Sequence, residues 1–67
     1  MDAGGYIGTG GLRIIVVDDH AVVREGLVRI LEGTGRGFSV AEASSGFQAL
    51  EWLRRNRAEL AIVDLSM

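Results

Sequence analysis

An uninterrupted run of four β-branched residues, Ile14-Ile15-Val16-Val17, limits what this chain can fold into more than any other feature. Such a run has no polar face for water, so it is typical of a strand buried on both sides of a parallel sheet. Two acids, Asp18 and Asp19, follow it directly. Because parallel strands need crossover connections, which are usually helices, the run predicts an α/β fold with helices on both faces of the sheet.

The segment after the two acids has helical periodicity. Its expected buried face is formed by residues that recur at helical spacing: Val23, Leu27, Ile30, Leu31 and Thr34. Its charged residues are assigned mostly to the solvent face: Arg24, Glu25, Arg29 and Glu32. The glycine-rich segment 33–37 should end this helix by providing a left-handed cap, and Asp19 is a candidate cap at its start.

The alternation of strand and helix then repeats. Segment 38–43 partly alternates in polarity and predicts a strand at an edge of the sheet. Ser45 lies three residues before Gln48, the capping-box spacing that begins a helix. The predicted apolar stripe of this helix consists of Ala49, Leu50 and Leu53, and the flanking aromatics Phe47 and Trp52 are expected to pack or to be covered by a partner chain. Its C-terminal end is predicted to be basic and exposed to solvent, with Arg54, Arg55 and Arg57. Segment 60–63 is the third strand, followed by Asp64.

The resulting β-α-β-α-β order predicts parallel strands in the spatial order 2-1-3, with the two helices on opposite faces. The crevice between the first and third strands is then the switch point where open α/β sheets bind ligands. Strand 60–63 is as apolar as strand 14–17, and the sequence ends soon after it. We therefore expect a fragment, or a chain that another chain completes.

Composition narrows the class of protein. The chain has 67 residues, enough for one small domain, with a net charge of −2 that gives no reason to expect nucleic-acid binding. It has no cysteine, one histidine, no secretory signal and no apolar run long enough for a membrane span, which predicts a soluble cytoplasmic protein. Residues 1–11 are interpreted as a flexible, glycine-rich leader. They precede the first strand, so they do not form a phosphate-binding loop.

Three acids are expected to meet at one end of the sheet. Asp18, Asp19 and Asp64 all follow strands, and the first and third strands are neighbours in the predicted order. Two carboxylates about 5 Å apart repel each other by about 3 kcal/mol at an effective dielectric constant of 20. Protonation or a hard cation relieves this repulsion, and Mg²⁺ is the obvious candidate. His20 is interpreted as a helix-start residue near the acids.

Several short segments, taken in order, carry a resemblance to a known family. Val17-Asp18-Asp19-His20, Arg24-Glu25-Gly26-Leu27, Ala43-Ser44-Ser45-Gly46 with Ala49-Leu50, and Ile62-Val63-Asp64-Leu65 resemble the receiver domain of two-component response regulators. The motifs Asp18-Asp19-His20 and Arg24-Glu25-Gly26-Leu27 are similar to those of the LuxR/NarL-type branch. The resemblance to the receiver domain covers residues 12–67. It implies the N-terminal half of a flavodoxin-like (CheY-like) domain.

The resemblance also implies roles for individual residues. Asp64 would be the nucleophile that accepts a phosphoryl group from a sensor histidine kinase. Asp19 and Asp64 would bind Mg²⁺ directly, Asp18 would bind it through water, and the main-chain carbonyl of Ser66 would add a ligand. The domain would be a regulatory phosphoacceptor and not an enzyme, and it would control DNA binding by a separate C-terminal helix-turn-helix module.

The chain departs from the family pattern in what it lacks. The family has a serine or threonine after a fourth strand and a lysine after a fifth, and these 67 residues contain neither strand and no lysine. We therefore expect that this chain does not switch. Two other hypotheses stay open. One is a self-associating module that forms a homodimer through the edge of strand 60–63. The other is an aspartate-nucleophile phosphatase, disfavoured because Asp18 and Asp19 are adjacent and do not form a DxD pattern.

Overall fold

The computed structural model describes residues 12–64, so the expected leader at 1–11 and residues 65–67 lie outside it. Its elements are β1 (Arg13–Val17), α1 (Ala21–Glu32), β2 (Ser39–Ala43), α2 (Gly46–Leu53) and β3 (Leu60–Val63). This confirms the β-α-β-α-β order. Within residues 12–64, neither helix has the length and apolar character needed to cross a membrane.

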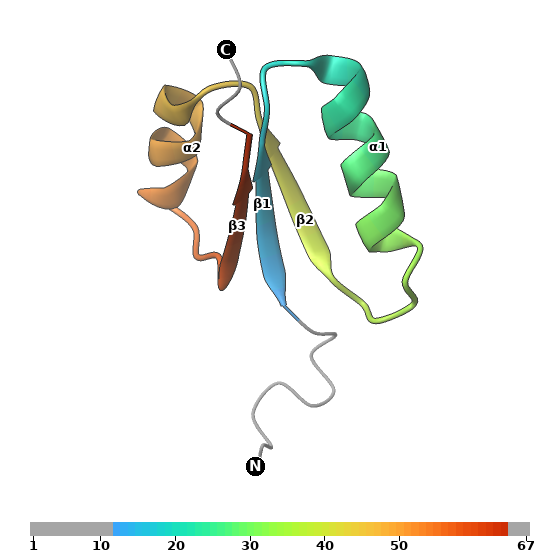
Figure 1. Ribbon diagram of the computed structural model, residues 1–67. Coiled ribbons are helices and arrows are strands. Elements are labelled where there is room, and N and C mark those ends of the chain that lie inside the picture. The colour runs from blue at the N-terminus through green and yellow to red at the C-terminus, as the bar shows by residue number, and fades with distance from the viewer. Residues whose placement is uncertain (1–11, 65–67) are drawn as a thin grey trace.

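The three strands form one parallel sheet in the order β2-β1-β3, as predicted from the sequence. Val17 at the end of β1 lies opposite Ala43 of β2 and Val63 of β3. The carboxyl ends of all three strands are therefore level with one another. The loops that follow β1 and β2 lie at one end of the sheet, where α2 also begins (Figure 1).

The core is centred on β1, where four consecutive side chains are buried. Ile15 and Val17 pack with Ala43 and Ala49, and Trp52 lies against this cluster. Ile14 and Val16 point to the opposite face, because side chains alternate along a strand. Figure 1 shows α1 and α2 on opposite sides of the sheet, which explains why β1 has no polar face.

The predicted buried face of α1 is partly wrong. Val23 and Ile30 are exposed, with Ile30 at 66%. The side of α1 nearest the sheet carries Leu27, Val28 and Leu31, together with Arg24, which had been assigned to solvent. The spacing of this second set is equally helical, so periodicity alone did not identify the face that packs.

The ends of α1 also differ from the prediction. His20, not Asp19, is the N-cap residue, and its side chain makes no capping hydrogen bond. At the C-terminal end Gly33 has an ordinary φ of −76°. The positive φ values of 74° belong to Gly35 and Gly37, so left-handed glycines shape the turn into β2 and do not cap the helix.

The start of α2 is confirmed, and its buried face is corrected. Ser45 Oγ accepts a hydrogen bond from the Gln48 main-chain N–H at 3.1 Å. The Gln48 side chain returns to the N–H and hydroxyl of Ser44, one residue earlier than a standard capping box. Ala49 and Trp52 face the sheet, whereas Leu50 is exposed, as is the flanking aromatic Phe47.

The three arginines expected at the C-terminal end of α2 follow its last residue, Leu53. The helix ends there because the carbonyl of Trp52 accepts from the N–H of Arg55 at 3.1 Å and from the side chain of Asn56 at 2.8 Å. Arg54, Arg55 and Arg57 are all exposed, as expected.

Candidate functional site

Main-chain hydrogen bonds bring the predicted acids to the same end of the sheet. The N–H of Asp18 donates to the carbonyl of Ala43 at 3.1 Å, and the N–H of Asp64 donates to the carbonyl of Val17 at 3.0 Å. The main-chain hydrogen bonding between the strands thus continues one residue beyond the end of β1 and one residue beyond the end of β3. The Asp18-Asp19 pair is consequently fixed next to the residue that follows β3.

Asp18 is the buried member of this group, with 1% of its side chain exposed. Its Oδ1 atom accepts a hydrogen bond from the main-chain N–H of His20 at 2.8 Å. Its Oδ2 atom is buried with no hydrogen-bond partner within the described residues. A buried carboxylate oxygen without a partner is costly, and such an atom is explained by a bound water or a cation.

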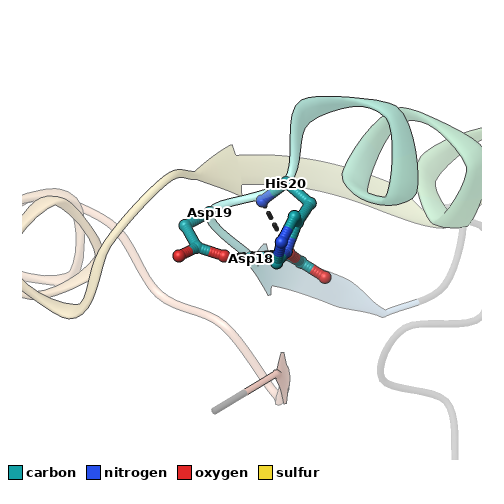
Figure 2. Close-up of side chains that lie close together, drawn as sticks. All are labelled: Asp18, Asp19 and His20. Carbon is teal, nitrogen blue, oxygen red and sulfur yellow. Dashed lines mark hydrogen bonds and ion pairs between the residues drawn. The ribbon is translucent and has the colours of Figure 1, made fainter. Parts of the chain in front are cut away.

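Asp19 is exposed and lies on the other side of the loop from Asp18 (Figure 2). Its Oδ1 atom is 2.9 Å from Nδ1 of His20, and that nitrogen is 3.3 Å from Oδ1 of Asp18. Asp18, Asp19 and His20 each offer one ligand atom within 4.8 Å of the others, an arrangement that suits a metal ion.

Asp19 and Asp64 also share a hollow at the carboxyl end of the sheet. It is lined by these two acids, by Val17 and Val63, and by the loop residues Ser44, Ser45 and Gly46 before and at the start of α2. The hollow lies between the ends of β1 and β3, the crevice predicted from the strand order. Asp18 is buried and does not line it, so the structure brings Asp19 and Asp64, but not Asp18, together in one hollow.

Arg24 is a site residue that the sequence reasoning missed. Its Nη1 atom donates to the main-chain carbonyl of Asp18 at 2.6 Å, and its Nε atom donates to Oε1 of Glu42 at 3.0 Å. The signal was its spacing from Leu27, Val28 and Leu31, which places it on the half-buried face of α1. Ser66, the other predicted ligand, lies outside the described residues.

The nearby arginine does not neutralise the carboxylates of Asp18 and Asp19. Arg24 forms its ion pair with Glu42, and it bonds the main chain of Asp18 instead of its carboxylate. Within residues 12–64, the side chain that pairs with the carboxylates of Asp18 and Asp19 is that of His20. Oxygen ligands of this kind suit Mg²⁺, which binds through one or two carboxylates and retains waters.

Comparison with known proteins decides the family. The sequence profile of the response regulator receiver domain matches residues 14–67, which contain every predicted site residue. The chain belongs to the response regulator receiver domain family. The flavodoxin-like half-domain predicted from the sequence agrees with this match and with the strand order. The LuxR/NarL-type branch, also predicted, agrees with two regulators among the relatives.

Relatives of this receiver domain include regulators and an enzyme. "Response regulator UvrY" of Escherichia coli K12 is 41% identical over 56 residues, which cover 84% of this chain and 26% of the relative. "Probable transcriptional regulatory protein NarL" of Mycobacterium tuberculosis H37Rv is 39% identical over 56 residues, with the same coverage of each chain. A "Protein-glutamate methylesterase/protein-glutamine glutaminase 1" of Paramagnetospirillum magneticum is 42% identical over 59 residues, covering 88% of this chain and 16% of that protein.

The chain therefore spans about a quarter of the length of the first of these relatives. No solved structure gives a significant match to the chain.

Proposed function

We propose that this receiver domain is the phosphoacceptor of a transcriptional response regulator, with Asp64 as the residue that takes the phosphoryl group. The observation that carries the proposal is the shared hollow of Asp19 and Asp64 at the end of the sheet. Family membership supports it, since residues 14–67 match the receiver domain. The role is regulatory: the domain is not itself an enzyme, although one relative is named as a methylesterase.

In the proposed transfer, an oxygen of Asp64 attacks the phosphorus of a kinase phosphohistidine. The new P–O bond forms as the P–N bond breaks, and the electron pair returns to the histidine nitrogen. The phosphoryl group would enter the hollow beside Asp64, where Asp19 is the second acid of the lining. The partner is a sensor histidine kinase, and we place the exchange in the cytoplasm.

The residues fit a magnesium ion. Asp19 and Asp64 would bind it directly, Asp18 would act through water, and the carbonyl of Ser66 would complete the protein ligands. The unpartnered Oδ2 of Asp18 supports this assignment, because a buried carboxylate oxygen without a donor is costly and a nearby cation would offset that cost. When bound, the cation would neutralise charge on the phosphoryl oxygens.

The parent protein would use this domain to control DNA binding through a separate helix-turn-helix module. The relative NarL, described as a transcriptional regulatory protein, supports this proposal.

Chemical phosphorylation tests the role of Asp64. The chain is incubated with phosphoramidate and Mg²⁺, and the modified residue is located by mass spectrometry of proteolytic peptides. We expect one phosphoryl group on Asp64, slow to form, and none in Asp64→Asn. Modification of the Asp64→Asn variant to the same extent as the wild type would contradict the assignment.

A second candidate function is self-association through β3. Within the described residues β3 pairs with β1 alone, and Leu60 and Val63 are 46% and 49% exposed. An unpaired strand edge is a template for a second copy, and a symmetric dimer would give a continuous sheet. The solution mass measured over a concentration series tests this: a dimer is expected, and a monomer at every concentration would exclude it.

A further inference from the structure

A second hollow lies at the amino end of the sheet, opposite to the end that carries the acids. It has a volume of about 180 Å³ and is lined by residues of β1, β2 and α2: Arg13, Ser39, Val40, Ala41 and Trp52. None of these residues lines the hollow of Asp19 and Asp64. This second hollow, called the Trp52 hollow below, is therefore distinct from the candidate phosphorylation site.

The Trp52 hollow exists because β2 contributes small side chains to the face that α2 covers. Arg13 lies opposite Ser39, and Ile15 lies opposite Ala41. Side chains alternate along a strand, so these four residues share one face of the sheet. Trp52, in the last turn of α2, packs with Ala41 against the core cluster of that face. A large ring over a serine and an alanine leaves space that a bulkier strand residue would fill.

The position of Trp52 is fixed by hydrogen bonds to its main chain. Its carbonyl accepts from the N–H of Arg55 at 3.1 Å and from the side chain of Asn56 at 2.8 Å. Trp52 is half-buried, so part of its indole packs on the core and part is open to the hollow. A fixed indole offers a planar apolar surface on which an aromatic ring can stack with little loss of conformational freedom.

Arg13 places a positive charge beside this indole. Its structural bonds are made by its main chain, whose N–H donates to Oε1 of Glu59 at 2.7 Å and whose carbonyl accepts from the N–H of Glu59 at 2.9 Å. Among residues 12–64 its exposed guanidinium takes part in no ion pair. A guanidinium of this kind suits a carboxylate, to which it donates two parallel hydrogen bonds.

We propose that the Trp52 hollow binds a small aromatic carboxylate, with its ring against Trp52 and its carboxylate on Arg13. The volume of about 180 Å³ limits the ligand, since sites for drug-sized molecules have roughly 300–1,000 Å³. Ser39, opposite Arg13, adds a hydroxyl at the charged end of the hollow. The inference uses neither Asp64 nor the acidic loop, so it goes beyond the proposed function and does not depend on it.

NMR of the indole N–H tests the proposal on the whole chain, labelled with nitrogen-15. Trp52 is the one tryptophan, so the indole signal belongs to it. The chain is titrated with benzoate, with benzyl alcohol, which has the ring without the charge, and with acetate, which has the charge without the ring. We expect a saturable shift with benzoate, about fivefold weaker binding of benzyl alcohol, and no saturable shift with acetate.

Substitutions separate the roles of charge and space. Arg13→Gln should weaken benzoate binding by about fivefold and leave benzyl alcohol binding unchanged. Arg29→Gln is the matched control, because Arg29 is exposed on α1, on the other side of the sheet (Figure 1), and it should change neither affinity. Ala41→Leu should fill the hollow and abolish binding of both ligands. If Ala41→Leu does not fold, Arg13→Gln still decides, because the fold uses only the main chain of Arg13 for its hydrogen bonds.

Three results would overturn the inference. One is equal affinity for benzoate and benzyl alcohol, or for benzoate in the wild type and Arg13→Gln. Another is a benzoate shift that rises in proportion to concentration without saturating. The third is an indole signal that changes with protein concentration but not with benzoate, which would mean that a second copy covers the hollow. None of these results bears on Asp64, whose reaction with phosphoramidate tests the proposed function separately.

Discussion

The guanidinium of Arg24 donates a 2.6 Å hydrogen bond to the main-chain carbonyl of Asp18, at the start of the acidic loop. The same side chain pairs with Glu42 near the end of β2. Arg24 is only 17% exposed, whereas Glu42 is 43% exposed, so the bond to the Asp18 carbonyl is the better shielded of the two interactions. One residue of α1 thereby fixes the loop between β1 and α1 to the neighbouring strand.

Replacing Arg24 should loosen this loop. We expect Arg24→Gln to lower the free energy of unfolding by about 1.5–3 kcal/mol, because a partly buried carbonyl loses a charged donor. Urea denaturation followed by circular dichroism measures the change. Arg29→Gln is the matched control, since Arg29 is exposed on the same helix, and it should change stability by less than about 0.5 kcal/mol. Equal effects of the two substitutions would exclude the anchoring role.

Asp18→Asn should stabilise the chain more without metal than with it. Without metal, the asparagine amide removes a buried charge and retains an oxygen that accepts the His20 N–H. The free energy of unfolding should therefore rise by about 1–3 kcal/mol. With Mg²⁺ the advantage should shrink, because the variant binds the ion more weakly. Urea denaturation in chelator and in magnesium measures both states. A variant less stable than the wild type in chelator would contradict this account of Asp18.

Ser45→Ala should destabilise the start of α2. Its hydroxyl accepts from the Gln48 N–H, and loss of such a cap costs about 1 kcal/mol. Ser45→Thr retains a hydroxyl and is the control. Thermal denaturation compares the two variants, and a stability for Ser45→Ala equal to that of Ser45→Thr would mean that the cap contributes nothing.

Ile15→Ala should unfold the chain or nearly so. Ile15 is fully buried at the centre of the sheet, and such truncations cost about 2–5 kcal/mol, much of what a domain of this size has. Ile30→Ala removes the same atoms from an exposed position of α1 and should be tolerated. Far-ultraviolet circular dichroism distinguishes them; a folded, cooperative Ile15→Ala variant would show that β1 is not the core.

The order of the strands could be predicted because local rules determine it. The apolar run at 14–17 requires cover on both faces, and short crossovers have one hand, so β1 must lie between β2 and β3. The same rules placed Asp19 and Asp64 at one end of the sheet. These arguments need only periodicity and the direction of the chain, both of which the sequence contains.

The side-chain interactions of the loop could not be predicted in the same way. Arg24 was assigned to solvent because a charged residue usually is, yet the carbonyl of Asp18 and the carboxylate of Glu42 give it partners on the half-buried face of α1. Likewise, the approach of His20 to both acids depends on the turn that the Asp18 side chain forms with the His20 N–H. Such contacts depend on loop conformation, which periodicity does not determine.

The most direct test of the central claim, that Asp64 accepts the phosphoryl group beside a magnesium ion, is fluorine NMR with beryllofluoride, which mimics a phosphoryl group. The account predicts a protein-bound fluorine signal in the wild type that requires Mg²⁺ and is absent from Asp64→Asn. A bound signal of equal size in Asp64→Asn, or none in the wild type at saturating Mg²⁺, would contradict it.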